Sequence, residues 1–337
     1  MKGLIYILPL LTFYSAFGQT KTAQEFGFRH IVFKYKTEDI DILIKSRKGD
    51  ENLPKPLFFF CQGSLPIPLI IHQDKDVYGT FPFNPDSLSL KYHLVIVSKP
   101  NIPLIAEAST LKPNFAYVDS TGIFPKGYVE KNLLSYYVQR NIAIAKYLQN
   151  QDWVSTKELV VAGHSEGSTI AVKMASEFKK VTHLIYSGGN PMGRILSIIQ
   201  QSRVYETDTD STKHGEYNFD YWAEIVENKN EVYTSQGDAY KTTFEFSEPT
   251  IGYLEELRIP VLVTYGTRDW SSPYNDLLRV NIIRQKKSNF TFRAYIGTDH
   301  NFFPLTDDNQ PDYSIFNWDK VSNDWLNWLN EKANKSA

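Results

Sequence analysis

The sequence has very few of the features that tie a chain to a metal, a nucleic acid or a disulfide scaffold. Its single cysteine, Cys61, excludes an intrachain disulfide. No pair of histidines or cysteines has the spacing of metal ligands, so we expect no metal and no cofactor. The formal net charge is −2 without a long basic run, which argues against a nucleic-acid surface.

Internal repeats and low-complexity segments are also missing from the sequence. What is present is typical of a packed globular chain, because 42% of the residues are hydrophobic and 22% are charged. A length of 337 residues fits one large domain, or a domain that carries an insertion.

The first residues are typical of a secretory signal peptide. A positively charged start precedes an apolar stretch over residues 4–11, and Ala16 and Gly18 are small residues at the −3 and −1 positions of a cleavage site. The apolar stretch is too short to cross a bilayer. We therefore expect residues 1–18 to be removed, leaving no stable membrane anchor, and the mature chain to be secreted or periplasmic. An ordinary buried N-terminal strand is the alternative.

Hydrophobic patterns predict an α/β domain. Runs at residues 29–35 and 39–45 alternate or are rich in β-branched residues, so they predict an antiparallel pair. Later runs are continuous, as in strands buried on both faces of a parallel sheet; they cover residues 56–61, 92–98, 158–162, 182–186, 259–265 and 290–296. Segments of helix length cover residues 128–150, 168–178, 273–284 and 318–329. This alternation predicts a three-layer domain, with a mostly parallel central sheet and helices on both faces.

Residues 190–257 interrupt the alternation of strands and helices. The segment is polar and rich in tyrosine, and it is too long for a structureless loop inside a compact domain. We expect a helical cap over the carboxyl edge of the sheet, inserted into a catalytic domain that covers residues 19–337. A flexible surface excursion is the alternative.

Residues 163–167 read Gly-His-Ser-Glu-Gly and lie between an apolar strand and a helix. The serine of such a motif lies on a sharp, strained turn from strand to helix. Gly163 and Gly167 have no Cβ to clash with neighbouring segments, and the helix N-terminus stabilises negative charge that develops near the serine. The pattern therefore predicts Ser165 as a nucleophile, with a packing role for His164. A Gly/Ser-rich helix cap is the alternative.

A serine hydroxyl needs a general base, and the base needs an acid that orients it. Among the seven histidines, His300 is the best candidate because it follows the last apolar run, in a turn that can reach the sheet edge. Asp269 follows the strand that lies between the serine and this histidine in the sequence. We therefore expect Asp269 to be the acid, with Asp299 and Asp276 as rivals.

Two N–H donors must also hold the negative oxygen of a tetrahedral intermediate. The backbone N–H of Glu166, directly after the nucleophile, is expected to be one of them. The turn at Gly63 follows the strand at residues 56–61 and lets the chain approach the serine, so the Ser64 N–H is expected to be the other. Leu65 is an alternative donor, and an ordinary glycine turn is the alternative for the loop.

Together these residues resemble the α/β-hydrolase superfamily. The order Ser165, Asp269, His300 matches the family's order of nucleophile, acid and histidine, and the loop at Ser64 matches its oxyanion loop. The resemblance runs from about residue 29 to the C-terminus, without the insertion. One departure is Gln62, which stands where many members have a histidine that shapes the loop, so the subgroup stays open.

The resemblance implies acyl transfer to water through an acyl-enzyme, but it does not fix a substrate. We expect a serine hydrolase that cleaves a carboxylic ester or a related acyl bond in a small molecule or short peptide. A serine peptidase or amidase of the prolyl-oligopeptidase type is one alternative. A non-catalytic binding protein on a hydrolase scaffold is another, and the oligomeric state is not predicted.

Overall fold

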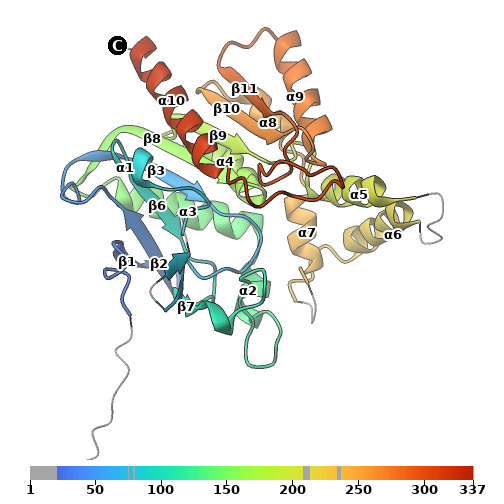
Figure 1. Cartoon of the computed structure of the whole chain (residues 1–337), viewed down its shortest axis with the longest axis horizontal. Helices are drawn as coiled ribbons and strands as arrows, with labels where there is room; N and C mark the ends of the chain where they lie inside the picture. The colour runs from blue at the N-terminus through green and yellow to red at the C-terminus, as the bar shows by residue number, and fades with distance from the viewer. Residues whose placement is uncertain (1–20, 75, 79, 208–212, 234–236, 337) are drawn as a thin grey trace, which may run out of the picture.

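A mostly parallel sheet forms the centre of the molecule (Figure 1). The computed structural model describes residues 21–74, 76–78, 80–207, 213–233 and 237–336, so the predicted signal peptide at residues 1–18 lies outside the described residues. The sheet has eight strands in the order β1-β2-β6-β3-β8-β9-β10-β11. Their bounds are β1 Arg29–Tyr35, β2 Glu38–Lys45, β3 Lys55–Cys61, β6 His93–Val97, β8 Val154–His164, β9 His183–Ser187, β10 Val261–Gly266 and β11 Phe290–Tyr295.

The pairing of the strands follows the two kinds of pattern in the sequence. The alternating runs form β1 and β2, which pair antiparallel, and β2 pairs antiparallel with β6. Every other neighbouring pair, from β6–β3 to β10–β11, is parallel. The continuous apolar runs therefore became the buried parallel strands.

Helices cover both faces of the sheet, and β3 shows why. Leu57 and Phe59 point into one core, whereas Phe58 and Phe60 point into the other, because successive side chains of a strand alternate between faces. The first core is completed by α3 Leu134–Leu148, α4 Glu166–Glu177, α8 Ile251–Glu256 and α9 Ser272–Arg284, and the second by α1 Asp86–Ser89 and α10 Trp318–Ser336. This arrangement confirms the predicted three-layer α/β fold.

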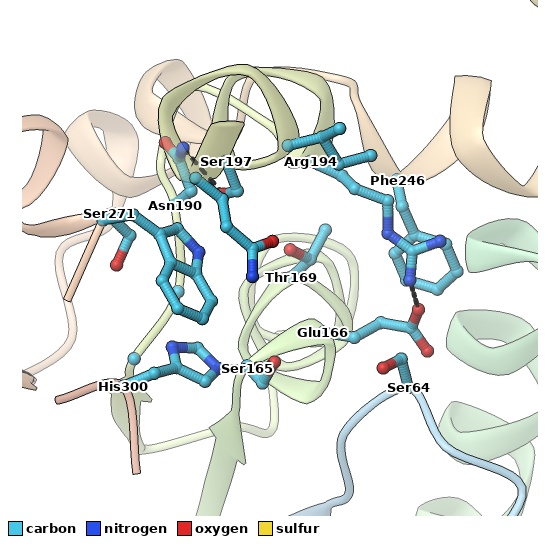
Figure 2. Close-up of a pocket in the computed structure, with 15 residues that line it drawn as sticks. Ser64, Ser165, Glu166, Thr169, Asn190, Arg194, Ser197, Phe246, Ser271 and His300 are labelled. Atoms are coloured by element: carbon cyan, nitrogen blue, oxygen red, sulfur yellow. Dashed lines mark hydrogen bonds and ion pairs between the residues drawn. The ribbon is translucent and has the colours of Figure 1, made fainter. Parts of the chain in front are cut away.

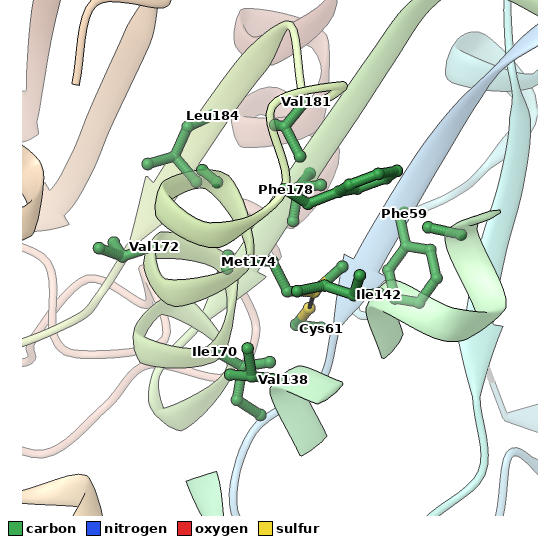
Figure 3. Packing of buried hydrophobic residues seen from close by; sticks show 14 of the residues in the cluster. Phe59, Cys61, Val138, Ile142, Ile170, Val172, Met174, Phe178, Val181 and Leu184 are labelled. Carbon is green, nitrogen blue, oxygen red and sulfur yellow. Dashed lines mark hydrogen bonds between the residues drawn. The ribbon is translucent and has the colours of Figure 1, made fainter. Parts of the chain in front are cut away.

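Cys61 belongs to the first core, where Figure 3 shows it near Ile142 and Met174. Its Sγ lies 3.8 Å from the Met174 Sδ and 3.9 Å from the Asn141 Nδ2. Burial raises the pKa of the Cys61 thiol to about 12. The side chain therefore stays a neutral thiol near pH 7 and serves as a small packing group.

The helix expected at residues 128–150 is divided into two, α2 Lys126–Lys131 and α3 Leu134–Leu148. Asn132 lies at the break with φ −74° and ψ 61°. Its buried amide donates to the Asp238 carboxylate at 2.9 Å and accepts from the Tyr137 hydroxyl at 3.0 Å. These two hydrogen bonds stabilise a non-helical backbone at Asn132, which hydrophobic spacing alone does not reveal.

A second, three-stranded sheet was not expected from the sequence. It has the order β5-β4-β7, with β4 Ile70–Gln73, β5 Asp76–Tyr78 and β7 Ile105–Glu107, and the short η1 Ala108–Thr110 follows β7. Strands of three or four residues carry too little alternation to stand out from a loop.

The segment at residues 190–257 contains α5 Arg194–Tyr205, α6 His214–Glu227, α7 Tyr240–Phe246 and α8 Ile251–Glu256. Figure 1 shows α5 and α6 side by side, projecting at one end of the molecule. The Trp222 ring of α6 stacks on Phe244 of α7, with centroids 5.9 Å apart. Among the described residues, no helix combines the length and apolar character needed to cross a bilayer.

Candidate active site

The candidate site lies where the loops that leave the parallel strands meet. Parallel neighbours end at the same edge of a sheet, so their following loops are brought together. Ser165 follows β8, Asp269 follows β10 and His300 follows β11. Figure 2 shows Ser165 beside His300 at this edge.

A continuous chain of hydrogen bonds connects these three residues. The His300 Nε2 lies 2.9 Å from the Ser165 Oγ, and its Nδ1 lies 2.8 Å from the Asp269 Oδ2. The Ser271 N–H donates to the Asp269 Oδ1 at 2.9 Å, and the Ser271 hydroxyl donates to the Oδ2 at 2.8 Å. The carboxylate is thus fixed on both oxygens, and it can hold the imidazole with its Nε2 free to accept the serine proton.

Electrostatic interactions among these three residues favour a charged imidazole beside a charged carboxylate. Burial alone lowers the pKa of His300, but the charge of Asp269 and its hydrogen bond outweigh burial, so the pKa is raised above the ordinary 6.5. Burial alone raises the pKa of Asp269, but the charge of His300 and hydrogen bonds from His300 and Ser271 lower it below the ordinary 3.8. A proton taken from Ser165 would therefore be stabilised on His300.

Ser165 occupies a strained turn between β8 and α4. Its backbone has φ 58° and ψ −127°, a conformation that L-residues rarely adopt. A Cβ at Gly163 would lie 2.0 Å from the Gly167 carbonyl oxygen, and a Cβ at Gly167 would lie 2.0 Å from the Cys61 carbonyl oxygen. Both glycines of the motif are therefore required by the close approach of backbone segments.

His164 packs beside this arrangement instead of joining it. Its Nδ1 lies 3.1 Å from the Ser187 Oγ, and its Nε2 lies 3.2 Å from the Asn301 Oδ1. Burial lowers the pKa of His164 to about 3, so the ring is neutral near pH 7. It supports the His300 ring, with centroids 5.0 Å apart.

The loop after β3 passes directly beside Ser165. A Cβ at Gly63 would lie 3.7 Å from the Ser165 Cβ, which is ordinary van der Waals contact, so this approach does not by itself require glycine. Gln62 donates from its Nε2 to the Val97 carbonyl oxygen at 2.6 Å. The glutamine thereby ties the loop to the neighbouring strand β6, at the position where the resembling family often has histidine.

Two buried side chains fix the Ser64 peptide group from behind. The Lys99 Nζ donates to the Ser64 carbonyl oxygen at 2.9 Å, and the Tyr128 hydroxyl donates to the same oxygen at 2.8 Å. In a trans peptide the next N–H points opposite to the carbonyl, so these bonds direct the Leu65 N–H away from Lys99. Sequence reasoning missed both residues, although Lys99 directly follows the expected strand at residues 92–98.

The Glu166 side chain joins a network of charged side chains beside Ser165. It pairs with Arg194 and lies 3.6 Å from the Lys99 Nζ, while the Arg194 Nη1 lies 2.7 Å from the Asp238 Oδ2. Burial lowers the pKa of Lys99, against the opposing charges of Glu166 and Asp238. Burial also acts to lower the pKa of Arg194, but Glu166 and Asp238 raise it overall. The network links the loop after β6, α4 and α5, and its two cations balance its two carboxylates.

Trp270 is a further residue that the sequence did not single out. Its ring stacks on His300, with centroids 5.2 Å apart and an angle of 18° between the planes. The tryptophan covers one face of the imidazole, which restricts water there and limits ring rotation. Its position directly after Asp269 was the available signal.

Comparison with known proteins gives one family match. Residues 137–304 match the family model described as BAAT / acyl-CoA thioester hydrolase C terminal. The matched range contains Ser165, Asp269 and His300. No curated protein matches the sequence.

Solved structures show the same fold at low sequence identity. Acylaminoacyl peptidase from Pyrococcus horikoshii has 13% identity and a TM-score of 0.50 over 81% of this chain and 37% of its own. A Bacteroides ovatus protein described as a dipeptidyl aminopeptidase IV has 10% identity and a TM-score of 0.53 over 90% of this chain and 35% of its own. A puromycin-hydrolyzing peptidase from Mycobacterium tuberculosis has 14% identity and a TM-score of 0.50 over 82% and 36%. The chain thus spans little more than a third of these neighbours, and the likeness extends to fold.

Proposed function

We propose that this chain, an α/β-hydrolase by fold, is a serine hydrolase that cleaves a carboxylic ester or a related acyl bond. The observation that carries the proposal is the hydrogen-bonded series Ser165–His300–Asp269, with the serine on a strained turn at the carboxyl edge of the sheet. The match to an acyl-CoA thioester hydrolase model is consistent with acyl transfer. We further propose that the enzyme acts outside the cytoplasm, as its predicted signal peptide implies.

The proposed reaction begins when the Ser165 Oγ attacks the carbonyl carbon of the substrate and His300 takes its proton. Asp269 holds the imidazolium that forms. The backbone N–H of Glu166 and one from the loop after β3, that of Ser64 or its alternative Leu65, donate to the oxyanion. These hydrogen bonds strengthen as the carbonyl becomes tetrahedral. The carbonyl then re-forms as the bond from its carbon to the leaving oxygen, sulfur or nitrogen breaks, and His300 gives the proton to that leaving atom. The acyl group stays on the Ser165 Oγ.

The second half of the cycle releases the acid. A water molecule loses its proton to the Nε2 of His300 and attacks the acyl carbon, with the same two N–H donors holding the oxyanion. The bond to the Ser165 Oγ breaks as His300 returns the proton to it. The products are a carboxylic acid and the alcohol, thiol or amine of the leaving group.

A peptidase is the second candidate, because the structural neighbours include an acylaminoacyl peptidase and a puromycin-hydrolyzing peptidase. The two functions are separated by measuring kcat/KM on p-nitrophenyl acyl esters of rising chain length and on aminoacyl p-nitroanilides. We expect the esters to be cleaved with at least tenfold higher kcat/KM than the anilides. The reverse order would make the enzyme a peptidase. Failure to cleave either series or to react with a fluorophosphonate would leave a non-catalytic binding protein.

The acid limb of the pH profile is expected above pH 6.5. His300 must be neutral to accept the serine proton, and its pKa is raised from 6.5 by the neighbouring Asp269. We therefore expect kcat/KM to fall about tenfold per pH unit below that raised pKa. An acid limb below pH 6 in steady-state assays on an ester would contradict this arrangement.

The free energy of unfolding depends on the protonation of His300 in the opposite direction from kcat/KM. A histidine with a raised pKa adds stability that is fully present below its unfolded pKa and is lost as the pH rises through its folded pKa. Asp269, with a lowered pKa, adds stability above its unfolded pKa that is lost as the pH falls through its folded pKa. Urea unfolding measured at the same pH values as the kinetics separates the two effects.

A further inference from the structure

Two pockets of different character meet at Ser165. The first, here called the apolar pocket, has a volume of about 490 Å³. The second, here called the polar pocket, has a volume of about 230 Å³. Both are lined by Ser64, Ser165, Trp270 and His300. A carbonyl carbon attacked by the Ser165 Oγ would therefore lie where the two pockets meet.

The apolar pocket is built by the loop after β3 and the start of α10. Its wall is mostly hydrocarbon and aromatic, with Phe60, Leu65, Ile67, Leu69, Trp270 and Trp318 among the lining residues. At the roughly 30 Å³ that one water occupies in the liquid, the volume holds about 16 non-hydrogen atoms. A wall of this kind favours a large apolar group, because its burial removes apolar surface from water.

The polar pocket is built by α4, α5 and the loop after β9. Figure 2 shows Asn190, Arg194 and Ser197 above the serine and histidine. Thr169 and Gln201 also line it, so most of its lining side chains carry a group that can donate or accept a hydrogen bond. By the same measure its volume holds only about eight non-hydrogen atoms. A small group that accepts hydrogen bonds fits this wall, and a large hydrocarbon does not.

The charges around the polar pocket favour an uncharged group. Arg194 is the cation in its wall, and both of its Nη atoms already pair with carboxylates, those of Glu166 and Asp238. Lys99 supplies the second positive charge of this network, because its Nζ lies 3.6 Å from the Glu166 carboxylate. An anionic substrate would add a third negative charge to this neutral network without a new partner. A guanidinium has five N–H groups, so an ether or carbonyl oxygen can still bind to Arg194.

From these features we propose the substrate class, and the proposal rests on the function proposed above. The substrate is a neutral ester with a large apolar group on one side of the scissile bond and a small, hydrogen-bond-accepting group on the other. The apolar pocket takes the large group and the polar pocket takes the small one. Ile67 and Gln201 are then specificity-determining residues for opposite ends of the substrate.

Matched esters test the apolar pocket. The first pair is 2-naphthylmethyl methoxyacetate and methyl methoxyacetate, and the second pair is 2-methoxyethyl 2-naphthylacetate and 2-methoxyethyl acetate. Hydrolysis is followed by acid release in a pH-stat. We expect one pair to show at least a tenfold higher kcat/KM for the naphthyl member, since even one methylene in an apolar pocket is worth about tenfold or more. The pair that shows it identifies whether the apolar pocket holds the acyl or the alcohol group.

Two filling variants locate the preference. Ile67→Trp fills the apolar pocket and should bring the naphthyl-to-methyl ratio of the responsive pair close to one. Gln201→Trp places the same large side chain in the polar pocket. It should lower kcat/KM for the naphthyl and the methyl ester by a similar factor and leave their ratio unchanged. Fluorophosphonate labelling of each variant reports whether the folded site is intact.

A charged ester tests the polar pocket. When the methoxy end of the responsive naphthyl ester is replaced by a carboxylate of similar size, kcat/KM should fall at least tenfold. Preference for the carboxylate, equal rates for naphthyl and methyl esters, or a ratio that survives Ile67→Trp would each overturn the inference while the hydrolase function stands. Absence of turnover on every ester, with no fluorophosphonate labelling, would overturn both.

Discussion

Replacing Ser165 with alanine is expected to lower kcat for ester hydrolysis by about 10⁶-fold, to a rate close to background. The Ser165 Oγ lies 2.9 Å from the His300 Nε2, and alanine removes both the attacking atom and the proton that His300 would take. The remaining N–H donors and the two pockets would still bind the substrate, so KM should change much less than kcat. Background-corrected initial rates on the best p-nitrophenyl ester measure the effect.

A control on the same helix separates the chemistry from folding. Ser176 of α4 is half-buried and lies far along the helix from the turn, so Ser176→Ala should keep kcat within about twofold. Alanine can adopt the strained backbone of position 165 no more easily than serine, and the thermal midpoints of the two variants should be similar. If Ser165→Ala retained wild-type turnover and still reacted with a fluorophosphonate, the proposed nucleophile would be wrong.

Much of this fold could be predicted because the buried strands are short runs of apolar residues. The expected run at residues 29–35 became β1 with the same bounds, and the run at residues 290–296 became β11 with a difference of one residue. The candidate site followed from the same information. Once a strand is placed in a parallel sheet, the residue after its carboxyl end is placed at the common edge. This is why Ser165, Asp269 and His300 could be named before their distances were known.

The surroundings of the site could not be predicted in this way, because they depend on contacts between distant segments. Lys99 reads as one more lysine after a strand, and only the tertiary structure places it against the Ser64 carbonyl. Arg194 and Asp238 are separated by 44 residues and meet through the packing of the segment at residues 190–257. The stacking of Trp270 on His300 likewise needs the two loops in place. Side-chain identity gives no sign of such partners without the fold.

Replacing Asp269 with asparagine is expected to lower kcat on the order of 10⁴-fold while the backbone stays in place. The Ser271 N–H would still bond to the amide oxygen, which replaces the carboxylate oxygen that it contacts at 2.9 Å. The amide nitrogen would then face the His300 Nδ1 and donate to it. This fixes the tautomer with the proton on Nε2, the nitrogen that must accept from Ser165. The variant therefore places a donor against a donor at the reacting hydroxyl.

The pH profile distinguishes this loss from general damage to the site. Without the negative charge of Asp269, the pKa of His300 loses the strongest of the interactions that raise it, so the acid limb should move to lower pH. The matched control is Asp276→Asn, because Asp276 accepts from the Tyr265 hydroxyl at 2.5 Å and has no bond to His300. Asp299, whose Oδ1 accepts from the Asn301 and Phe303 N–H groups, also raises the pKa of His300 by its charge, though less than Asp269 does. Asp299→Asn should therefore move the acid limb in the same direction but by less. A loss at Asp276 or Asp299 as large as that at Asp269, with the same shift of the acid limb, would assign the acid elsewhere. A loss confined to Asp269 is expected, because among these three carboxylates it alone bonds to His300.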